Sequence, residues 1–294
     1  MYNILTAREE MSVFFSLIIP TLNEERYVPN LLSDIDRQAT REFEVIIVDA
    51  KSTDKTKEKV LAFGQKMPVQ FVTSPKKNVS FQRNFGTKFA HGEYYIFLDA
   101  DVRLTKDFLT QIKLATQKKH NGVFLPYMLP EDNSQKTKVM ISFVNTLIRM
   151  SQTYGKPLAP GGNLIVRADI FRKVRGFSED VFISEDHDFV RRAYKLGYKA
   201  KIVRHARLYI SMRRNKAEGD TALIYKYIVA FLMYTMTPGN NALRKKIFDY
   251  EMGGHRYLLD ELGKKQKSKK GVAYLRQLLQ LSTVFMVFRY IGKM

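Results

Sequence analysis

The chain has 294 residues, of which 45% are hydrophobic and 27% are charged, a composition typical of globular proteins and unlike that of disordered ones. This length accommodates one large domain, or one domain with a helical appendage. The absence of cysteine excludes disulfides and thiolate metal sites but indicates nothing about the compartment. The formal net charge of +20 favours nucleic acid, anionic lipid or phosphate-rich substrates, without choosing among them.

The N-terminal residues show no secretory signal. Arg8, Glu9 and Glu10 interrupt the start of the chain, and the apolar run Val13–Ile19 is too short for a signal core or a membrane span. We therefore expect a cytoplasmic protein, with the inner face of the cell membrane as the alternative position.

Buried strands alternate with helices in the first hundred residues. Apolar runs predict strands over residues 13–19, 43–48, 69–73 and 94–98. Helical spacing predicts helices over residues 25–38, 53–66 and 80–91, with Gly92 ending the last one. Strands rich in Ile, Val and Phe, each followed by a helix, imply an α/β fold with a Rossmann-like, mostly parallel sheet flanked by helices.

The second half of the chain is less regular. We expect helices over residues 133–154 and 185–196, and short strands over residues 164–166, 199–203 and 208–212. Residues 1–214 are the predicted catalytic domain, and residues 215–294 are a predicted basic helical extension. The basic excess is concentrated in residues 199–294, which carry a net charge of +14. Its apolar stretches, Tyr227–Met236 and Leu278–Ile291, are shorter than the roughly 20 residues of a membrane span. Ordinary helix packing is the favoured interpretation, and binding to an anionic membrane surface or to the acceptor is the alternative.

Three polar clusters follow predicted strands, at Thr21–Glu24, Asp49–Ser52 and Asp99–Asp101. In open parallel sheets, ligands bind beyond the carboxyl ends of the strands, so these clusters are expected to form one site. Asp99 and Asp101 lie two residues apart directly after the apolar run YYIFL, where both carboxylates can meet one Mg²⁺ or Mn²⁺ ion that also holds a diphosphate. A solvated turn is the alternative, and the position after the fourth strand favours the metal.

Other charged groups have both a functional and a structural interpretation. Asp49 ends a strand and can accept a hydrogen bond from a nucleobase, whereas Thr53 or Asp54 caps the next helix. Arg83, at a helix start, suits an anion, and the alternative is a solvated basic face. One of the carboxylates of Glu185 and Asp186 suits a general base, and the alternative is a helix start in which Ser184 with Asp188 forms part of the cap.

Five segments resemble, in this order, family 2 glycosyltransferases of the GT-A fold: LIIPTLNEE, VIIVDAKSTDKT, SFQRNFGTKFAHGEYYIFLDADV, PGGNLIVRADIFRKVRGF and SEDHDFVRRAYKLGY. The resemblance covers roughly residues 13–214. It implies an inverting, hexosyltransferase-type enzyme that uses a UDP- or GDP-sugar with Mn²⁺ or Mg²⁺. The implied acceptor is a hydroxyl group, with a lipid-linked or cell-envelope glycan as the candidate.

The resemblance also implies roles for individual residues. The nucleotide would contact the strand-end and third-helix positions, which are Pro20, Thr21, Glu24, Asp49, Lys51, Arg83, Asn84, Asp99 and Ala100. The metal would be held by Asp99 and Asp101, with Asp101 as the preferred direct ligand. The remaining roles are the floor of the sugar and acceptor pocket (Gly161, Gly162, Asn163), the catalytic pair (Glu185, with Asp186 as base) and neutralisation of the diphosphate (Arg213, Arg214).

The chain departs from the family pattern in two places. Lys51 stands where an acidic residue or glycine is common, which adds a phosphate contact or alters base choice. The Q-x-x-R-W motif of processive members is missing, which favours single transfer. Ordinary surface roles are preferred for His187 and for His205, the latter a weak candidate for a further metal ligand.

Two rival functions follow from the charge and the fold. One is a basic nucleic-acid-binding protein, which the scattered basic residues and the lack of any binding motif disfavour, so no nucleic-acid partner is expected. The other is a non-catalytic nucleotide-binding relative, which the complete set of Asp99, Asp101 and Asp186 disfavours.

Overall fold

The structure, a computed structural model, describes residues 13–117, 122–181 and 184–211. The predicted helical extension, residues 215–294, lies outside the described residues, and its boundary at residue 214 stays a prediction. The elements in chain order are β1 (Phe15–Thr21), α1 (Val28–Asp36), β2 (Phe43–Asp49), α2 (Thr56–Leu61), β3 (Val69–Thr73), α3 (Val79–Gly86), the 3-10 helix η1 (Thr87–Phe89), β4 (Tyr94–Phe97), β5 (Arg103–Leu104), α4 (Phe108–Thr116), β6 (Val123–Pro130), α5 (Gln135–Ser151), β7 (Leu164–Arg167), α6 (Ala168–Val174), α7 (Glu185–Lys195) and β8 (Lys201–Ile210).

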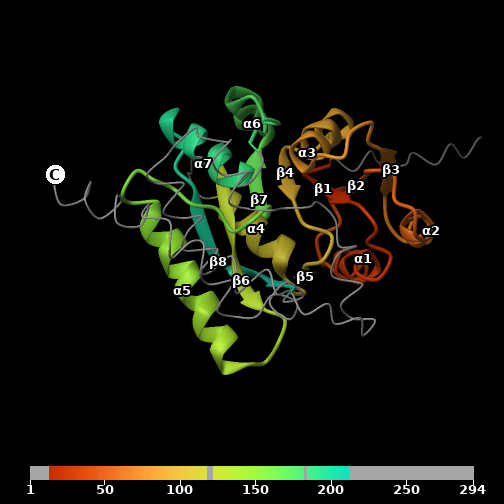
Figure 1. Cartoon of the computed structure of the whole chain (residues 1–294), viewed down its shortest axis with the longest axis horizontal. Coiled ribbons are helices and arrows are strands. Elements are labelled where there is room, and N and C mark those ends of the chain that lie inside the picture. Colours follow the sequence, from red (N-terminus) through yellow and green to blue (C-terminus); the bar gives the residue numbers. More distant parts are fainter. Residues whose placement is uncertain (1–12, 118–121, 182–183, 212–294) are drawn as a thin grey trace, which may run out of the picture. The chain divides into compact units, whose positions relative to one another are not determined.

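The described strands form one sheet in the order β3-β2-β1-β4-β7-β6-β8-β5 (Figure 1). Strands β3, β2, β1 and β4 run parallel, which confirms the predicted α/β fold with a mostly parallel sheet. Strand β7 runs antiparallel between β4 and β6, and β5 runs antiparallel to β8, so the sheet is mixed rather than wholly parallel.

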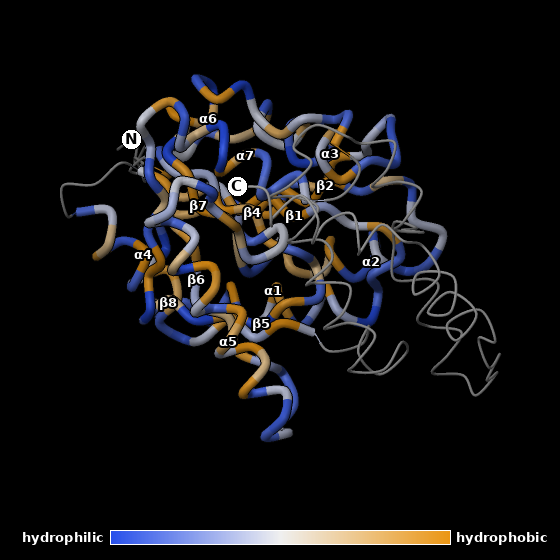
Figure 2. Tube along the Cα trace, turned by 60° about the vertical axis from the view of Figure 1, so that its left-hand side comes forward, coloured by the Kyte–Doolittle hydropathy of each residue, from blue (hydrophilic) through white to orange (hydrophobic). Residues whose placement is uncertain are grey.

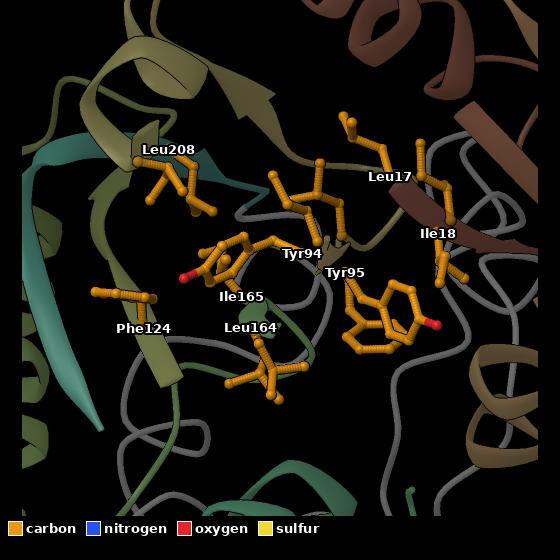
Figure 3. Packing of buried hydrophobic residues seen from close by; sticks show 14 of the residues in the cluster. Leu17, Ile18, Tyr94, Tyr95, Phe124, Leu164, Ile165 and Leu208 are labelled. Atoms are coloured by element: carbon orange, nitrogen blue, oxygen red, sulfur yellow. The ribbon is translucent and has the colours of Figure 1, made fainter. Parts of the chain in front are cut away.

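Apolar side chains fill both faces of the central strands. Consecutive residues of β1 and β2 are buried, a pattern that requires helices or other cover on each face. Figure 3 shows this packing between side chains of β1, β4, β6, β7 and β8, among them Ile18, Tyr95 and Ile165. Helix α3 lies especially close to the sheet, because a Cβ atom at Gly86 would stand 2.5 Å from Ile18 Cγ2 and 2.9 Å from Val48 Cγ2.

Pro20 is accommodated inside β1. The pairing between β1 and β4 ends at Ile18, so the missing N–H of Pro20 removes no hydrogen bond on that side. Strand β1 therefore continues to Thr21, two residues beyond the predicted end, and carries Thr21 to the edge of the sheet beside Asp49.

Four elements of the structure were not predicted, because no strong sequence pattern indicates them: β5, α4, β6 and α6. Strand β5 has two residues, and α6 has seven. Strand β6 contains Pro126, which argues against an inner strand, but the register between β6 and β8 shifts at that residue. Two short strands were expected where the structure has the single strand β8. Residues 204–206 have no partners on β6 because of the register shift, but pairing resumes at Arg207 and the strand continues.

Gly92 does not end a helix. Helix α3 ends at Gly86 and η1 ends at Phe89, whereas a Cβ atom at Gly92 would lie 2.6 Å from the Ser16 nitrogen. Close approach to β1 is therefore the reason for glycine at this position. In the described part of the chain, no helix combines the length and hydropathy needed to cross a membrane.

Candidate active site

Helix α3 links the carboxyl ends of the first strands. The side-chain nitrogen of Gln82 donates to the carbonyl of Thr21 at 3.1 Å and to that of Val48 at 2.7 Å, and the side chain is buried. Thr21 pairs directly with Asp49 across β1 and β2. Sequence reasoning gave Gln82 no role, although it lies within the segment SFQRNFG that was singled out.

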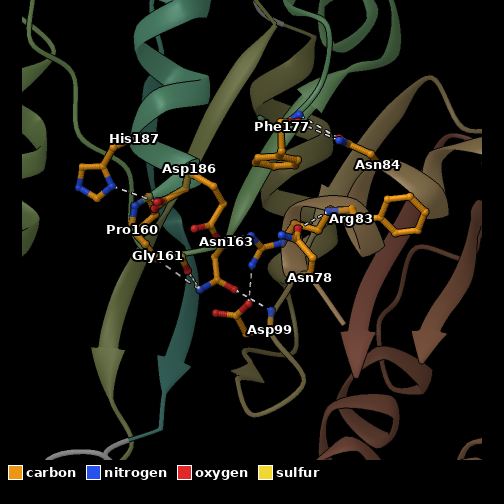
Figure 4. A network of polar contacts seen from close by, with 12 residues as sticks. Asn78, Arg83, Asn84, Asp99, Pro160, Gly161, Asn163, Phe177, Asp186 and His187 are labelled. Atoms are coloured by element: carbon orange, nitrogen blue, oxygen red, sulfur yellow. Dashed lines mark hydrogen bonds and ion pairs between the residues drawn. The ribbon is translucent and has the colours of Figure 1, made fainter. Parts of the chain in front are cut away.

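Arg83 joins the carboxyl end of β4 to the start of α7. Its guanidinium donates to Asp99 Oδ1 at 2.8 Å (Figure 4). It also donates to Glu185 Oε1 at 2.6 Å, and 2% of the Arg83 side chain is exposed. Burial disfavours its charge, but Asp99 and Glu185 outweigh burial and raise the pKa of Arg83. The guanidinium carbon also lies 5.4 Å from the centre of the Phe177 ring. Buried, ion-paired and stacked, Arg83 is a fixed cation that connects the two acidic motifs.

The segment before β7 closes against this ion pair. Gly162 has a φ of 69°, and a Cβ atom there would collide with Arg83 Nη2 and lie 2.5 Å from Asp99 Oδ1. The buried Asn163 accepts from the backbone N–H of Asp99 at 3.3 Å and donates to the Gly161 carbonyl at 2.8 Å (Figure 4). The structure thus places Gly162 and Asn163 beside Asp99, and Gly161 is hydrogen-bonded to Asn163.

Asp186 is a buried carboxylate at the start of α7. Its Oδ1 lies 3.0 Å from His187 Nδ1, and within the described residues its buried Oδ2 has no hydrogen-bond partner. Burial works to raise the pKa of Asp186, but His187 and Arg83 outweigh burial and lower it. The His187 side chain is 22% exposed and also contacts Asp186 directly. Ser184, the residue at the N-cap position, makes no side-chain capping bond.

The first two strand-end loops are tied to each other. Ser52 Oγ accepts from the Asn23 nitrogen at 2.8 Å, and Thr56 Oγ1 accepts from the Glu24 nitrogen at 2.9 Å. Both carboxylate oxygens of Asp49 accept from the Ser52 nitrogen at 3.0 Å. Burial raises the pKa of Asp49, although the hydrogen bonds from Ser52 oppose this. Asp49 therefore lies at the carboxyl end of β2, and its carboxylate has a fixed orientation.

Unusual backbone conformations gather in these loops. Among described residues other than glycine, Asn23, Lys51, Ser184 and Arg175 have positive φ angles, of 56°, 64°, 68° and 64°. The first three flank the predicted site, and strained residues of this kind concentrate at functional sites. Arg175 has a separate cause, since it ends helix α6. Composition and spacing carry no signal for such strain, so the sequence did not indicate it.

The Asn84 side chain is hydrogen-bonded to the backbone of Phe177. Its amide donates to the Phe177 carbonyl and accepts from the Phe177 nitrogen, each at 2.8 Å, so both ends of the amide hold this one residue (Figure 4). Phe177 in turn supports Arg83. The predicted nucleotide contact of Asn84 therefore stays a prediction, while its observed contacts position the arginine.

The donor set suits a divalent cation. Asp99, with 38% of its side chain exposed, and Asp101, half-buried, both follow β4. The described residues contain no cluster of three or more His, Asp or Glu side chains able to hold a metal. Mg²⁺ and similar ions commonly use one or two carboxylates together with substrate phosphates, so these two aspartates fit. His205 is exposed on β8, and Arg213 and Arg214 lie outside the described residues.

Pro20 and Ala100 are also predicted nucleotide contacts, and these contacts stay predictions. Pro20 pairs with Val48 inside the sheet, and the buried Ala100 lies between Asp99 and Asp101. Gln82 and Arg83, adjacent on α3, connect the cluster at Thr21 and Asp49 with the cluster at Asp99 and Glu185.

Comparison with known proteins gives consistent relatives. The chain is 26% identical over 221 residues to the poly(ribitol-phosphate) beta-N-acetylglucosaminyltransferase TarS of Staphylococcus aureus, covering 71% of this chain and 37% of TarS. It is 27% identical over 210 residues to the amylovoran biosynthesis glycosyltransferase AmsB of Erwinia amylovora, covering 64% of this chain and 66% of AmsB. The chain thus spans well under half the length of TarS.

Solved structures show the same fold. The crystal structure of S. aureus TarS 1-349 in complex with UDP-GlcNAc matches with a TM-score of 0.56 and 24% identity, covering 67% of this chain and 58% of that one. The mannosyltransferase PcManGT from Pyrobaculum calidifontis, in complex with GDP-Man and Mn²⁺, matches with a TM-score of 0.57 and 19% identity, covering 74% and 64%.

The family described as Glycosyl transferase family 2 matches residues 16–175, from β1 through the end of α6. This range includes the strand ends, Arg83, Asp99 and the Gly161–Asn163 segment. Because the match covers more than half of the sequence, the chain belongs to glycosyl transferase family 2.

Proposed function

We propose that this family 2 glycosyltransferase domain (EC 2.4) moves a sugar from a nucleotide-diphosphate donor to an acceptor hydroxyl, with inversion at the anomeric carbon. The donor proposal extends from the two related structures, which hold UDP-GlcNAc and GDP-Man. The acceptor proposed is a lipid-linked or cell-envelope glycan, because TarS is named for poly(ribitol-phosphate) and AmsB for amylovoran.

One observation carries the proposal: the buried carboxylate of Asp186 keeps an oxygen without a hydrogen-bond partner in the described residues, beside the ion pairs of Arg83. An unpaired buried oxygen is costly, and a catalytic role that brings a substrate hydroxyl to it accounts for that cost. Arg83 lies between this aspartate's neighbour Glu185 and Asp99, so the base and the donor side of the site are mechanically linked.

The proposed reaction uses Asp186 as general base. Asp186 accepts the proton of the acceptor hydroxyl, whose oxygen forms a bond to the anomeric carbon from the face opposite the diphosphate. The bond between that carbon and the diphosphate oxygen breaks, and the nucleoside diphosphate leaves with the electron pair. His187 and Arg83 keep Asp186 ionised before the reaction, because both stabilise its negative charge.

The donor is held by residues beside the carboxyl ends of the parallel strands. Asp49, oriented by Ser52, accepts a hydrogen bond from the nucleobase, and Gly161–Asn163 form the floor of the sugar pocket. Asp99 and Asp101 would hold Mn²⁺ or Mg²⁺, which supplies positive charge to the leaving diphosphate when bound. Lys51 and the arginines at positions 213 and 214 are proposed phosphate contacts.

A thermal-shift screen tests this proposal. UDP, GDP and their sugars are each added with and without Mn²⁺, and a donor that binds the folded chain raises its Tm. We expect one nucleotide to raise the Tm only with Mn²⁺, and Asp101→Ala to abolish that shift. Asp107→Ala, ten residues beyond the end of β4 and directly before α4, is the control and should retain it. No shift with any nucleotide, together with salt-sensitive binding to single-stranded nucleic acid, would instead support the rival function.

A further inference from the structure

Helix α5 uses one face to pack against the sheet. Its buried residues are Thr137, Ile141, Asn145, Ile148 and Ser151. The Asn145 side chain accepts from the Met128 nitrogen at 3.2 Å and donates to the Met128 carbonyl at 2.8 Å, which fixes α5 along β6. These buried residues and hydrogen bonds hold α5 against the sheet, so its packing does not require apolar residues on the opposite face.

The opposite face of α5 is also apolar. Val139, Phe143 and Met150 are 61%, 58% and 46% exposed. Their spacing of four and seven residues places them within about 40° of each other on the helix, directly opposite the buried stripe. An outward face normally carries polar side chains, so three large apolar residues at its centre form an unusual surface. We call Val139, Phe143 and Met150 the outer stripe.

Positive charge borders the outer stripe. Lys136, Lys138 and Arg149 are exposed on α5, and the helix contains no acidic residue. Tyr154, 75% exposed, and the exposed Lys156 extend the same character just past the helix. The other large exposed apolar residues, Leu61, Leu114, Leu196 and Tyr209, are scattered over separate parts of the described chain. Figure 2 shows the mixed orange and blue of α5 at the border of the described elements.

We propose that α5 binds an anionic membrane surface through the outer stripe. A helix with apolar residues flanked by Lys and Arg lies in the plane of the interface, its apolar side chains at the headgroup boundary and its cations on anionic lipid. Charge complementarity selects this partner, because three cations and no acid border the apolar centre. With 17 residues, α5 is too short to span a bilayer and must lie along it.

Docking of α5 would also orient the candidate active site. The Leu158 nitrogen donates to Ser151 Oγ at 2.9 Å, and the Gln152 side chain donates to the Leu158 carbonyl at 2.8 Å. These bonds tie the last turn of α5 to the segment that continues into Gly161–Asn163. The pocket floor is thus attached to the docking helix, which suits an acceptor held in the membrane. That consequence rests on the proposed function, but the docking itself does not.

Co-sedimentation of the full chain with vesicles tests the docking. We expect binding to phosphatidylcholine vesicles that contain about one third phosphatidylglycerol, and little binding to phosphatidylcholine alone. Phe143→Asp should weaken binding about tenfold or more, because an anchoring ring is replaced by a charge. Leu61→Asp is the matched control, since Leu61 is similarly exposed, at 53%, but lies on α2, and its binding should equal wild type.

A charge test addresses the flanking lysines. Lys136→Glu with Lys138→Glu should weaken binding roughly fivefold per lysine, while Lys57→Glu with Lys59→Glu, on α2, should change it much less. Circular dichroism and the nucleotide thermal shift confirm that each variant is folded.

Three results would overturn the docking proposal: no vesicle binding by wild type, equal weakening by Phe143→Asp and Leu61→Asp, or unchanged binding of Phe143→Asp. Two further measurements identify another occupant if vesicle binding is unchanged in Phe143→Asp. A lower sedimentation coefficient of the variant than of wild type, without lipid, would mean that a second copy of the chain covers the outer stripe. Faster proteolysis within residues 212–294 of the variant would mean that this part of the chain covers it. Nucleotide binding is measured separately, so failure of docking leaves the proposed transferase function standing.

Discussion

Among the acidic residues of the described chain, Asp186 is the one with a buried carboxylate oxygen that has no hydrogen-bond partner, while its other oxygen contacts His187. If it is the general base, Asp186→Asn keeps the shape and most contacts but cannot accept a proton. Turnover should fall about a hundredfold or more, with the Kd for the nucleotide nearly unchanged. Steady-state kinetics and calorimetric titration check the two parts. Wild-type turnover in the variant would remove Asp186 from this role.

The ionisation of Asp186 should also appear in stability. Its pKa is lower in the folded chain than the ordinary value, because His187 and Arg83 outweigh burial. Ionised Asp186 therefore stabilises the fold above about pH 4, and this contribution is lost as pH falls through the folded pKa. The difference in Tm between wild type and Asp186→Asn should therefore shrink as the pH falls below about 4. A difference that is constant, or that grows on acidification, would contradict the lowered pKa.

Gly161 and Gly162 form a natural pair of test and control. Both have left-handed backbones, with φ of 55° and 69°, so alanine strains each by about 1–2 kcal/mol. A Cβ atom at Gly161 meets no atom within 4 Å, whereas one at Gly162 would enter the Arg83–Asp99 ion pair. Gly162→Ala should therefore lower both Tm and transfer activity further than Gly161→Ala. Equal effects in both assays would mean that the ion pair tolerates displacement.

At the scale of elements, Asp34 of α1 holds the segment that follows Asp99 and Asp101, the proposed metal ligands. The buried Asp34 carboxylate accepts from Arg103 at 2.6 and 2.9 Å and from the Leu104 nitrogen at 3.1 Å, which holds β5 two residues after Asp101. Asp34→Asn should cost about 1–3 kcal/mol and raise the Mn²⁺ concentration needed for half-maximal activity.

The matched control for Asp34 is Asp36→Asn on the same helix. Asp36 forms an exposed pair with Arg41 at 3.3 Å, and such pairs contribute about 0–1 kcal/mol. Its Mn²⁺ dependence should equal wild type. If Asp34→Asn loses stability without any change in Mn²⁺ dependence, α1 supports the fold but does not position Asp101.

The elements that sequence predicted well are those in which a single pattern decides the structure. Strands β1, β2, β3 and β4 are short apolar runs, and their observed bounds differ from the predicted ones by no more than two residues. Helix α2 is shorter than predicted because its periodicity continues to Lys66 in the sequence, while the backbone forms turns after Leu61. Strand β6 was missed because Pro126 is compatible with a strand only at the register shift, which depends on β8.

The site was predictable where the family resemblance covers its segments. Placing Asp99 and Gly162 in one region followed from the family resemblance, and the structure brings them together. The supporting contacts were not predictable, because they join distant residues: Asn84 with Phe177, and Gln82 with the carbonyls of Thr21 and Val48. Neither residue type nor local spacing distinguishes such a supporting amide from one that contacts a ligand.

For the described chain as a whole, the strand order interleaves early and late segments. Strand β4 pairs with β7, and β5, from the first half of the chain, pairs with β8 at the far edge of the sheet. The parallel strands therefore share their core with the antiparallel ones, as Figure 3 shows for Leu17, Tyr94 and Ile165. We expect residues 13–211 to unfold as one cooperative unit rather than as two halves.

Two core substitutions test this cooperativity. Ile18→Ala in β1 and Ile165→Ala in β7 remove side chains with 0% exposure, and each should cost about 2–5 kcal/mol. In a single unit, both variants shift the same urea transition, and far-UV and tyrosine near-UV signals coincide. Leu61→Ala, at a position 53% exposed, should shift the midpoint much less. If Ile18→Ala moved one transition and Ile165→Ala another, the two halves would be independent, and the Arg83 link between them would not transmit stability.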